Sequence, residues 1–166
     1  GMSRSPVEPA LLPDGRRGPP SRRTGHGSSR DGERVLRKGM AAAPIAAEVH
    51  HALGLLLVGQ KRLTEALQQL READSLRPDQ ARYALAHALA LDALGQRAKA
   101  METLTRSYRG HPHDRDLLFA LATFSRNRGR MQDAIRYAKE LVGVAPEDPG
   151  AKQLLKELES RQGGNS

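Results

Sequence analysis

Residues 88–112 read ALALDALGQRAKAMETLTRSYRGHP, and the same order of glycine, alanine and proline returns 34 residues later in ATFSRNRGRMQDAIRYAKELVGVAP, residues 122–146. The stretch before them, GLLLVGQKRLTEALQQLREADSLRP at 54–78, keeps this order except that Lys61 stands in place of the glycine. Two columns share the spacing: Ala66, Ala100 and Ala134, and Pro78, Pro112 and Pro146. Several series in one register indicate an internal repeat of 34 residues.

Each recurring residue type has a physical role in a helix hairpin. Gly95 and Gly129 stand where a first helix would end, since glycine adopts the left-handed conformation without steric cost. The alanine column lets two helices approach closely, and the prolines end the second helix because proline has no amide proton to donate. Nearby aspartates are expected to cap the helices that follow: Asp79, Asp114 and Asp148. Apolar residues recur at spacings of three and four, so the sequence predicts an all-α fold.

The three units resemble the tetratricopeptide repeat (TPR) family. The first unit carries the family's order of large and small residues in Leu53-Gly54, Leu57, Ala66, Leu70, Ala73 and Pro78. The second has His87-Ala88, Leu91, Ala100, Leu104, Ser107 and Pro112, and the third has Leu121-Ala122, Ser125, Ala134, Ala138, Leu141 and Pro146. Four residues depart from the usual types: His87, Ser107, Ser125 and Leu141. The resemblance implies a right-handed α-solenoid of antiparallel helix hairpins over residues 46–161, with about seven helices. Its repeats would be 47–80, 81–114 and 115–148, followed by a capping helix at 149–161.

The two ends of the chain differ in composition from the repeats. Residues 1–45 hold six of the ten prolines and seven of the sixteen glycines, and their nine basic and four acidic side chains give a charge of +5. Such a segment buries little apolar surface, so residues 1–45 are predicted to be a disordered basic tail. Residues 162–166 are predicted to be a second disordered tail.

In TPR proteins the first helix of each hairpin lines a concave face that binds peptides. The resemblance places nine candidate contact residues on that face: His51, Leu55, Arg82, Leu85, Leu89, Asp92, Phe119, Thr123 and Arg126. The middle of the face would be apolar with charges toward its ends, which favours an amphipathic helix or an apolar extended peptide as the ligand. The competing interpretation is that some of these residues are core between adjacent helices.

One TPR subfamily grips the C-terminal carboxylates of chaperones with a clamp of lysine, asparagine and arginine. The residues at those positions here are His51, Leu55, Ala86, Asp116 and Ala120. The resemblance therefore argues against a chaperone carboxylate as the ligand.

Several function classes find no support in the composition. Cysteine is absent, which excludes disulfides, thiol catalysis and cysteine-based metal sites. No arrangement of catalytic residues stands out, so we expect a protein-binding scaffold and not an enzyme, with no cofactor and no metal. The longest apolar run, residues 53–58, is far shorter than the ~20 residues of a membrane span. Without a visible secretory signal, the expected location is cytoplasmic.

Three alternatives remain open. The repeats could be a docking or self-association module of a larger multidomain bacterial protein, with a homodimer formed through an exposed first hairpin. The basic tail at 1–45 could contact nucleic acid, although it lacks aromatic residues to stack on bases. A cluster of arginines at the third hairpin is either a solvated face or a docking site for an acidic partner: Arg126, Arg128, Arg130 and Arg136.

Overall fold

The computed structural model describes residues 25–42 and 47–164. This part of the chain folds into eight α-helices and contains no β-strand. The helices are α1 (Gly25–Ala42), α2 (Ala47–Gly59), α3 (Leu63–Leu76), α4 (Ala81–Ala93), α5 (Arg97–Gly110), α6 (Arg115–Asn127), α7 (Met131–Val144) and α8 (Pro149–Gly163). The predicted all-α class is confirmed, with one helix more than expected.

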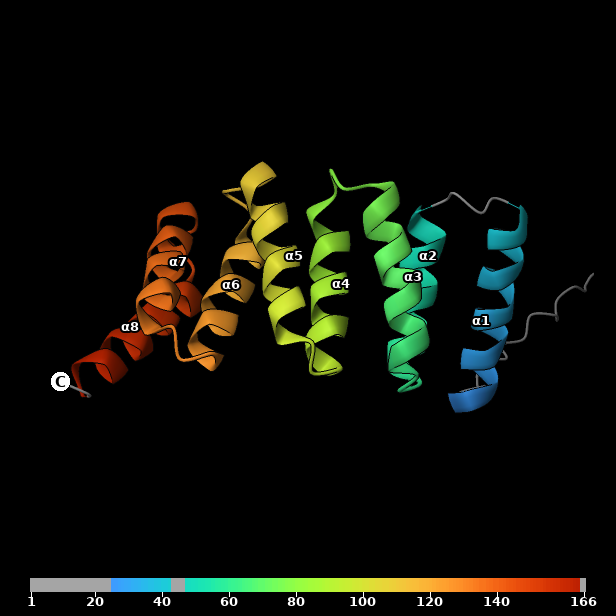
Figure 1. Cartoon of the computed structure of the whole chain (residues 1–166), viewed down its shortest axis with the longest axis horizontal. Helices are drawn as coiled ribbons and strands as arrows, with labels where there is room; N and C mark the ends of the chain where they lie inside the picture. Colours follow the sequence, from blue (N-terminus) through green and yellow to red (C-terminus); the bar gives the residue numbers. More distant parts are fainter. Residues whose placement is uncertain (1–24, 43–46, 165–166) are drawn as a thin grey trace, which may run out of the picture.

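The helices form a single row of antiparallel hairpins (Figure 1). α2 pairs with α3, α4 with α5 and α6 with α7, and the most extensive contacts lie within these pairs. Successive hairpins meet through α3 with α4 and α5 with α6, while α1 packs on α2 at one end and α8 on α7 at the other. Because each element contacts only its near neighbours, the architecture is the α-solenoid predicted from the 34-residue repeat.

The three hairpin turns share one backbone conformation. Lys61, Gly95 and Gly129 have positive φ angles of 62°, 79° and 76°. In each turn the amide of the following residue donates a hydrogen bond to the carbonyl five residues back, at 2.9, 2.8 and 2.8 Å. This bond satisfies a carbonyl at the end of the first helix, which is the function of a left-handed C-terminal cap. The glycine column is therefore explained, and Lys61 adopts the same conformation without being glycine.

The alanine column sits where the two helices of each hairpin meet. Ala66, Ala100 and Ala134 have no exposed surface. In the first hairpin Gly54 adds a second close contact, since a Cβ there would lie 2.5 Å from side-chain atoms of Leu70. The predicted close approach of the helices is confirmed at these positions.

Two of the three predicted aspartate caps form. Asp114 accepts a hydrogen bond from the amide of Leu117 at 2.9 Å, and Asp148 accepts one from the amide of Gly150 at 2.8 Å. The prediction for Asp79 is wrong, because α4 begins after Gln80, whose side chain makes no capping bond. Asp79 lies one residue before the capping position and instead accepts two hydrogen bonds from Arg77, which lower the pKa of its carboxyl group.

The prediction of disorder for residues 1–45 is wrong for residues 25–42, which form α1. Leu36 of α1 packs against the cluster formed by Leu53, Leu57 and Ala66 of the first hairpin. Residues 1–24 and 43–46 lie outside the described residues. The surface of the first hairpin that was expected to be exposed is thus partly covered, and α1 accounts for the additional helix.

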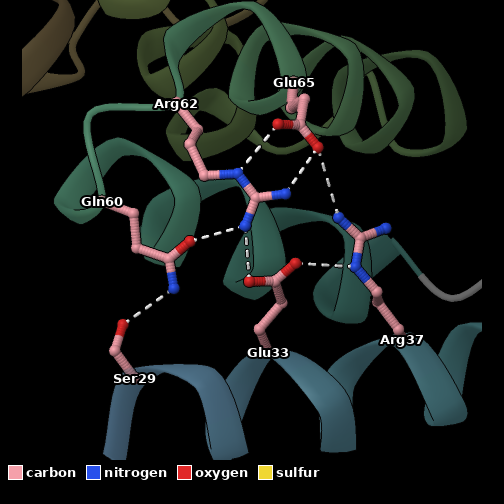
Figure 2. Close-up of polar contacts among 6 residues, drawn as sticks. All are labelled: Ser29, Glu33, Arg37, Gln60, Arg62 and Glu65. Atoms are coloured by element: carbon pink, nitrogen blue, oxygen red, sulfur yellow. Dashed lines mark hydrogen bonds and ion pairs between the residues drawn. The ribbon is translucent and has the colours of Figure 1, made fainter. Parts of the chain in front are cut away.

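A polar network fixes α1 on the loop between α2 and α3 (Figure 2). Glu33 of α1 lies 2.7 Å from the guanidinium of Arg62 and 2.9 Å from that of Arg37. Glu65 accepts hydrogen bonds from Arg62 at 2.8 and 2.7 Å, so the two carboxylates share one arginine between α1 and α3. Gln60 donates a further hydrogen bond to Ser29 at 3.0 Å. Composition alone missed α1 because Glu33 and Arg37, whose charges suggested a solvated tail, are paired with Arg62 and Glu65 of the first hairpin.

α8 closes the other end of the row. Ala151, Leu154 and Leu158 are buried and join the main core of the second and third hairpins. The helix ends at Gly163, two residues beyond the predicted end of the capping helix, so part of the predicted C-terminal tail is helical.

Candidate functional site

The first helices of the three hairpins form one continuous face. The backbones of α2 and α4, and of α4 and α6, approach each other closely, whereas those of α3 and α5 do not in the described part of the chain. Helices that pack closely lie on the inner side of a curved row, so α2, α4 and α6 line its concave face. Residues 34 positions apart therefore lie at matching heights on neighbouring helices.

Three of the nine predicted contact residues are large apolar side chains exposed on this face. Leu55, Leu89 and Phe119 each expose 50% of their surface. They come from α2, α4 and α6 in turn, and Leu55 and Leu89 occupy the same repeat position. Each helix is also anchored by fully buried residues on its other side, such as Leu53 in α2 and Leu121 in α6. The exposed residues form a stripe that runs across the hairpins.

The remaining apolar candidate, Leu85, is partly buried and packs against the main core. Leu85 therefore agrees with the alternative prediction that some of the candidate contact residues are core between adjacent helices. Val58, three residues after Leu55, is a further apolar side chain on α2 with 39% of its surface exposed. Val58 is not among the nine predicted residues, although it occupies the same repeat position as Asp92 and Arg126, which are.

Near the N-terminal ends of α2 and α4, beside the stripe, the side chains of His51, Arg82 and Tyr83 meet. The ring of His51 lies 4.8 Å from that of Tyr83, and the guanidinium of Arg82 lies 4.8 Å from the centre of the same tyrosine ring. Arg82 also donates a hydrogen bond to the Tyr83 hydroxyl at 3.1 Å and lies 3.7 Å from the carboxylate of Glu48. Burial, and then the charge of Arg82, lower the pKa of His51, so this histidine is neutral at pH 7.

Toward the C-terminal ends of α4 and α6, the predicted polar residues are bonded to neighbours in their own helix or the following turn and helix. Asp92 lies 3.9 Å from Arg97, and Arg126 donates a hydrogen bond to the side-chain oxygen of Asn127 at 3.2 Å. The hydroxyl of Thr123 donates to the carbonyl oxygens of Phe119 and Ala120, at 3.0 and 3.1 Å, and so turns back onto its own helix. The structure brings these residues onto the same face as the stripe, but their polar groups point mainly to neighbours.

Residues 25–42 and 47–164 contain neither a candidate metal site nor a candidate membrane-spanning helix. No group of three or more histidine, cysteine, aspartate or glutamate side chains there could hold a metal ion. None of the helices in these ranges is both long and apolar enough to cross a membrane.

Comparison with known proteins gives one family and a large set of similar folds. The sequence model of the tetratricopeptide repeat family matches residues 25–81 and 85–152. No curated protein matches the chain. The match begins at the first residue of α1, so α1 is part of the repeat array.

Three solved structures illustrate the similarity. A crystal structure of MamA has a TM-score of 0.73 at 18% identity, with 82% of this chain and 80% of that chain covered. The TPR protein TTC0263 from Thermus thermophilus has a TM-score of 0.68 at 21% identity, covering 80% of this chain and 73% of the other. The TPR domain of Arabidopsis OM64 has a TM-score of 0.61 at 21% identity, covering 69% of this chain and 95% of the other. At these identities the likeness concerns the fold alone.

Proposed function

The chain belongs to the tetratricopeptide repeat family, and we propose that it acts as a protein–protein interaction scaffold whose concave face binds a peptide or an amphipathic helix of a partner. The supporting observation is the stripe formed by Leu55, Leu89 and Phe119, which leaves three large apolar side chains half exposed on consecutive helices of the concave face. Single exposed apolar residues are common, whereas a stripe on a concave face is typical of a binding surface.

The stripe favours a partner that presents apolar residues at helical spacing. Complete burial of a half-exposed leucine or phenylalanine contributes about 1 kcal/mol before the cost of association. A few such anchors commonly dominate the affinity of an interface. Arg82 near the start of α4 and Arg126 near the end of α6 would orient the ligand, since the exposed ion pair of Arg82 with Glu48 is weak enough for a ligand carboxylate to compete.

The alternatives receive less support. A homodimer through the first hairpin would compete with α1, whose Leu36 packs on part of that hairpin. Nucleic-acid contact through residues 1–45 gains no support from Arg34 and Arg37 of α1, because both lie near carboxylates.

A pull-down from nuclease-treated lysate of the source cells, followed by affinity measurement with the purified partner, tests the proposal. The test variant is Leu89→Arg with Phe119→Arg, and the matched control is Thr64→Arg with Gln132→Arg, which adds the same charge at exposed positions of α3 and α7. We expect the test variant to weaken binding roughly tenfold or more while the control binds as the wild type does. Circular dichroism checks that both variants remain helical.

Two outcomes would contradict the proposal. One is a partner that binds the stripe variant and the wild type equally well. The other is binding that is lost on deletion of residues 1–24, which leaves α1 in place, or on nuclease treatment, since either result would move the function away from the concave face.

A further inference from the structure

A second concave feature lies between the second helices of the first two hairpins, away from the stripe. It is a hollow of about 1020 Å³ between α3 and α5, with Leu91 and His87 of α4 among its lining residues. Figure 1 shows α4 between α3 and α5 in the row. None of the nine residues predicted for the concave face lines this hollow.

The hollow is lined by five cationic side chains and one carboxylate. The cations are Arg71 of α3, Lys99, Arg106 and Arg109 of α5, and Arg128, which follows α6 directly. Glu102 is the single acidic residue among the lining residues. Residues from three separate parts of the chain thus bring positive charge to one place.

Four of these cations have no anionic partner among the described residues. Elsewhere in the repeats most arginines lie within ion-pair distance of a carboxylate: Arg62, Arg77, Arg82, Arg97, Arg115, Arg130 and Arg136. Arg130 and Arg136 both approach Asp133, so half of the arginine cluster noted in the sequence is paired. Only its member Arg128 belongs to the hollow. Unpaired cations around a concavity favour an anionic ligand.

The fifth cation, Arg106, is bound to the buried carboxylate of Asp74. Asp74 exposes only 4% of its side chain, and its carboxylate accepts a hydrogen bond from Arg106 and lies 2.9 Å from Nδ1 of His87. The buried charge of Asp74 is therefore compensated inside the protein and does not offset the other four cations. The contact also ties α3 to α4 and α5.

Apolar groups complete the lining. Leu67, Leu91 and Met101 belong to or pack against the main core, and all three contribute surface to the hollow. No phenylalanine, tyrosine or tryptophan is among its described lining residues, so it has no platform on which nucleic-acid bases could stack. Cations around an apolar base match a peptide that carries carboxylates beside an apolar side chain.

We propose that the hollow between α3 and α5 binds an acidic peptide segment of a partner protein. The unpaired cations Arg71, Lys99, Arg109 and Arg128 contact the carboxylates of that segment, and the apolar base receives an apolar side chain between them. The site is separate from the concave stripe, so the scaffold has two binding surfaces that can be occupied at the same time.

Fluorescence anisotropy with a labelled synthetic peptide of repeated Glu-Glu-Leu units tests this proposal, with the matched Gln-Gln-Leu peptide as ligand control. The full chain is compared with a variant carrying Arg71→Gln, Lys99→Gln, Arg109→Gln and Arg128→Gln. A control variant carries the same loss of charge at exposed positions elsewhere: Lys139→Gln, Lys152→Gln, Lys156→Gln and Arg161→Gln. The measurement is made at low ionic strength, because salt screens such contacts.

The expected result is binding of the acidic peptide alone, weakened roughly tenfold or more by the hollow variant and little changed by the control variant. The stripe variant Leu89→Arg with Phe119→Arg should bind this peptide as the wild type does, which separates the proposal from the function of the concave face. Equal weakening by the hollow and control variants would overturn it, since attraction by net charge would then suffice. Tighter binding of a single-stranded oligonucleotide at the hollow, or no binding of the acidic peptide, would also overturn it.

Discussion

Lys61 stands where the other two hairpins carry glycine, and it adopts the same left-handed backbone with φ 62°. An L-residue with a Cβ is strained in this conformation, whereas glycine is not. The hydrogen bond from the amide of Arg62 to the carbonyl of Leu57, at 2.9 Å, caps the C-terminus of α2 and offsets this strain.

Replacing Lys61 with glycine is therefore expected to stabilise the protein by about 0.5–1 kcal/mol. The reverse exchange in the next hairpin, Gly95→Lys, should lower the free energy of unfolding by about 1 kcal/mol, since nothing lies near its Cβ position and only the backbone strain changes. Urea denaturation of the three proteins measures both effects. Equal stabilities would show that the turn tolerates either residue.

His51 makes the stability of the protein depend on pH. Its pKa is lowered in the folded protein by burial and by the charge of Arg82, so the unfolded chain binds a proton at a higher pH than the folded chain does. The stabilising contribution of neutral His51 is thus complete above its unfolded pKa of about 6.5 and is lost as the pH falls below it.

We expect the wild type to lose more stability between about pH 7.5 and about pH 5.5 than the variant His51→Asn, which does not titrate in this range. The free energy of unfolding of both proteins at the two pH values gives the difference. An identical pH dependence in the two proteins would contradict the assignment.

At the scale of elements, α1 packs on α2 as α3 packs on α4. It packs mainly on α2 and the loop that follows it, through Leu36 and the polar network around Glu33 and Arg62. Ion pairs with a solvent-accessible arginine contribute little to stability, so the apolar contact of partly buried Leu36 should decide whether α1 stays docked.

The variant Leu36→Ala is expected to weaken docking of α1 by about 1–2 kcal/mol, because it removes a partly buried apolar side chain. Its neighbour Val35 exposes 68% of its surface, so Val35→Ala is a matched control with little effect. Hydrogen exchange of the α1 amides reports docking directly. Similar exchange in the two variants would mean that the polar network, and not Leu36, holds the helix.

At the scale of the whole molecule, the core is unevenly distributed. One large cluster extends from Leu67 to Leu158 through the second and third hairpins and α8, whereas the cluster of Leu53, Leu57 and Ala66 is separate and small. In a linear array each segment is stabilised mainly by its neighbours, so stability should fall toward the end with the smaller core.

Native-state hydrogen exchange should therefore show the lowest protection in α1, intermediate protection in α2, and the highest in α4 to α7. The reason is that opening α1 and α2 exposes the small cluster while leaving the large one intact. Uniform protection along the chain would indicate that the array unfolds as a single cooperative unit and would contradict this expectation.

The repeat can be predicted from the sequence because the residues that define it act within a single hairpin. A left-handed cap at Gly95, a close helix contact at Ala100 and a stop at Pro112 depend on the identity of single residues within one hairpin. Helix boundaries, turn conformations and the solenoid architecture follow from these positions.

The 34-residue spacing also predicts a helix at the position of α1. Gly32, Leu36 and Pro44 lie 34 residues before Ala66, Leu70 and Pro78, and so continue three of the repeat columns. The composition of residues 1–45 concealed this, because it averages a helix with a segment rich in proline and glycine.

Repeat position was also enough to select the residues on the concave face. It could not distinguish Leu89, which is half exposed, from Leu85, which packs on the core four residues earlier in the same helix. That difference depends on how closely neighbouring helices pack, which no single repeat determines. The hollow between α3 and α5 belongs to the same category, because residues as far apart as Leu67 and Arg128 line it. The sequence determined each hairpin through local conformational and steric preferences, while the stacking of hairpins alone decided which side chains remain exposed and where unpaired charges gather.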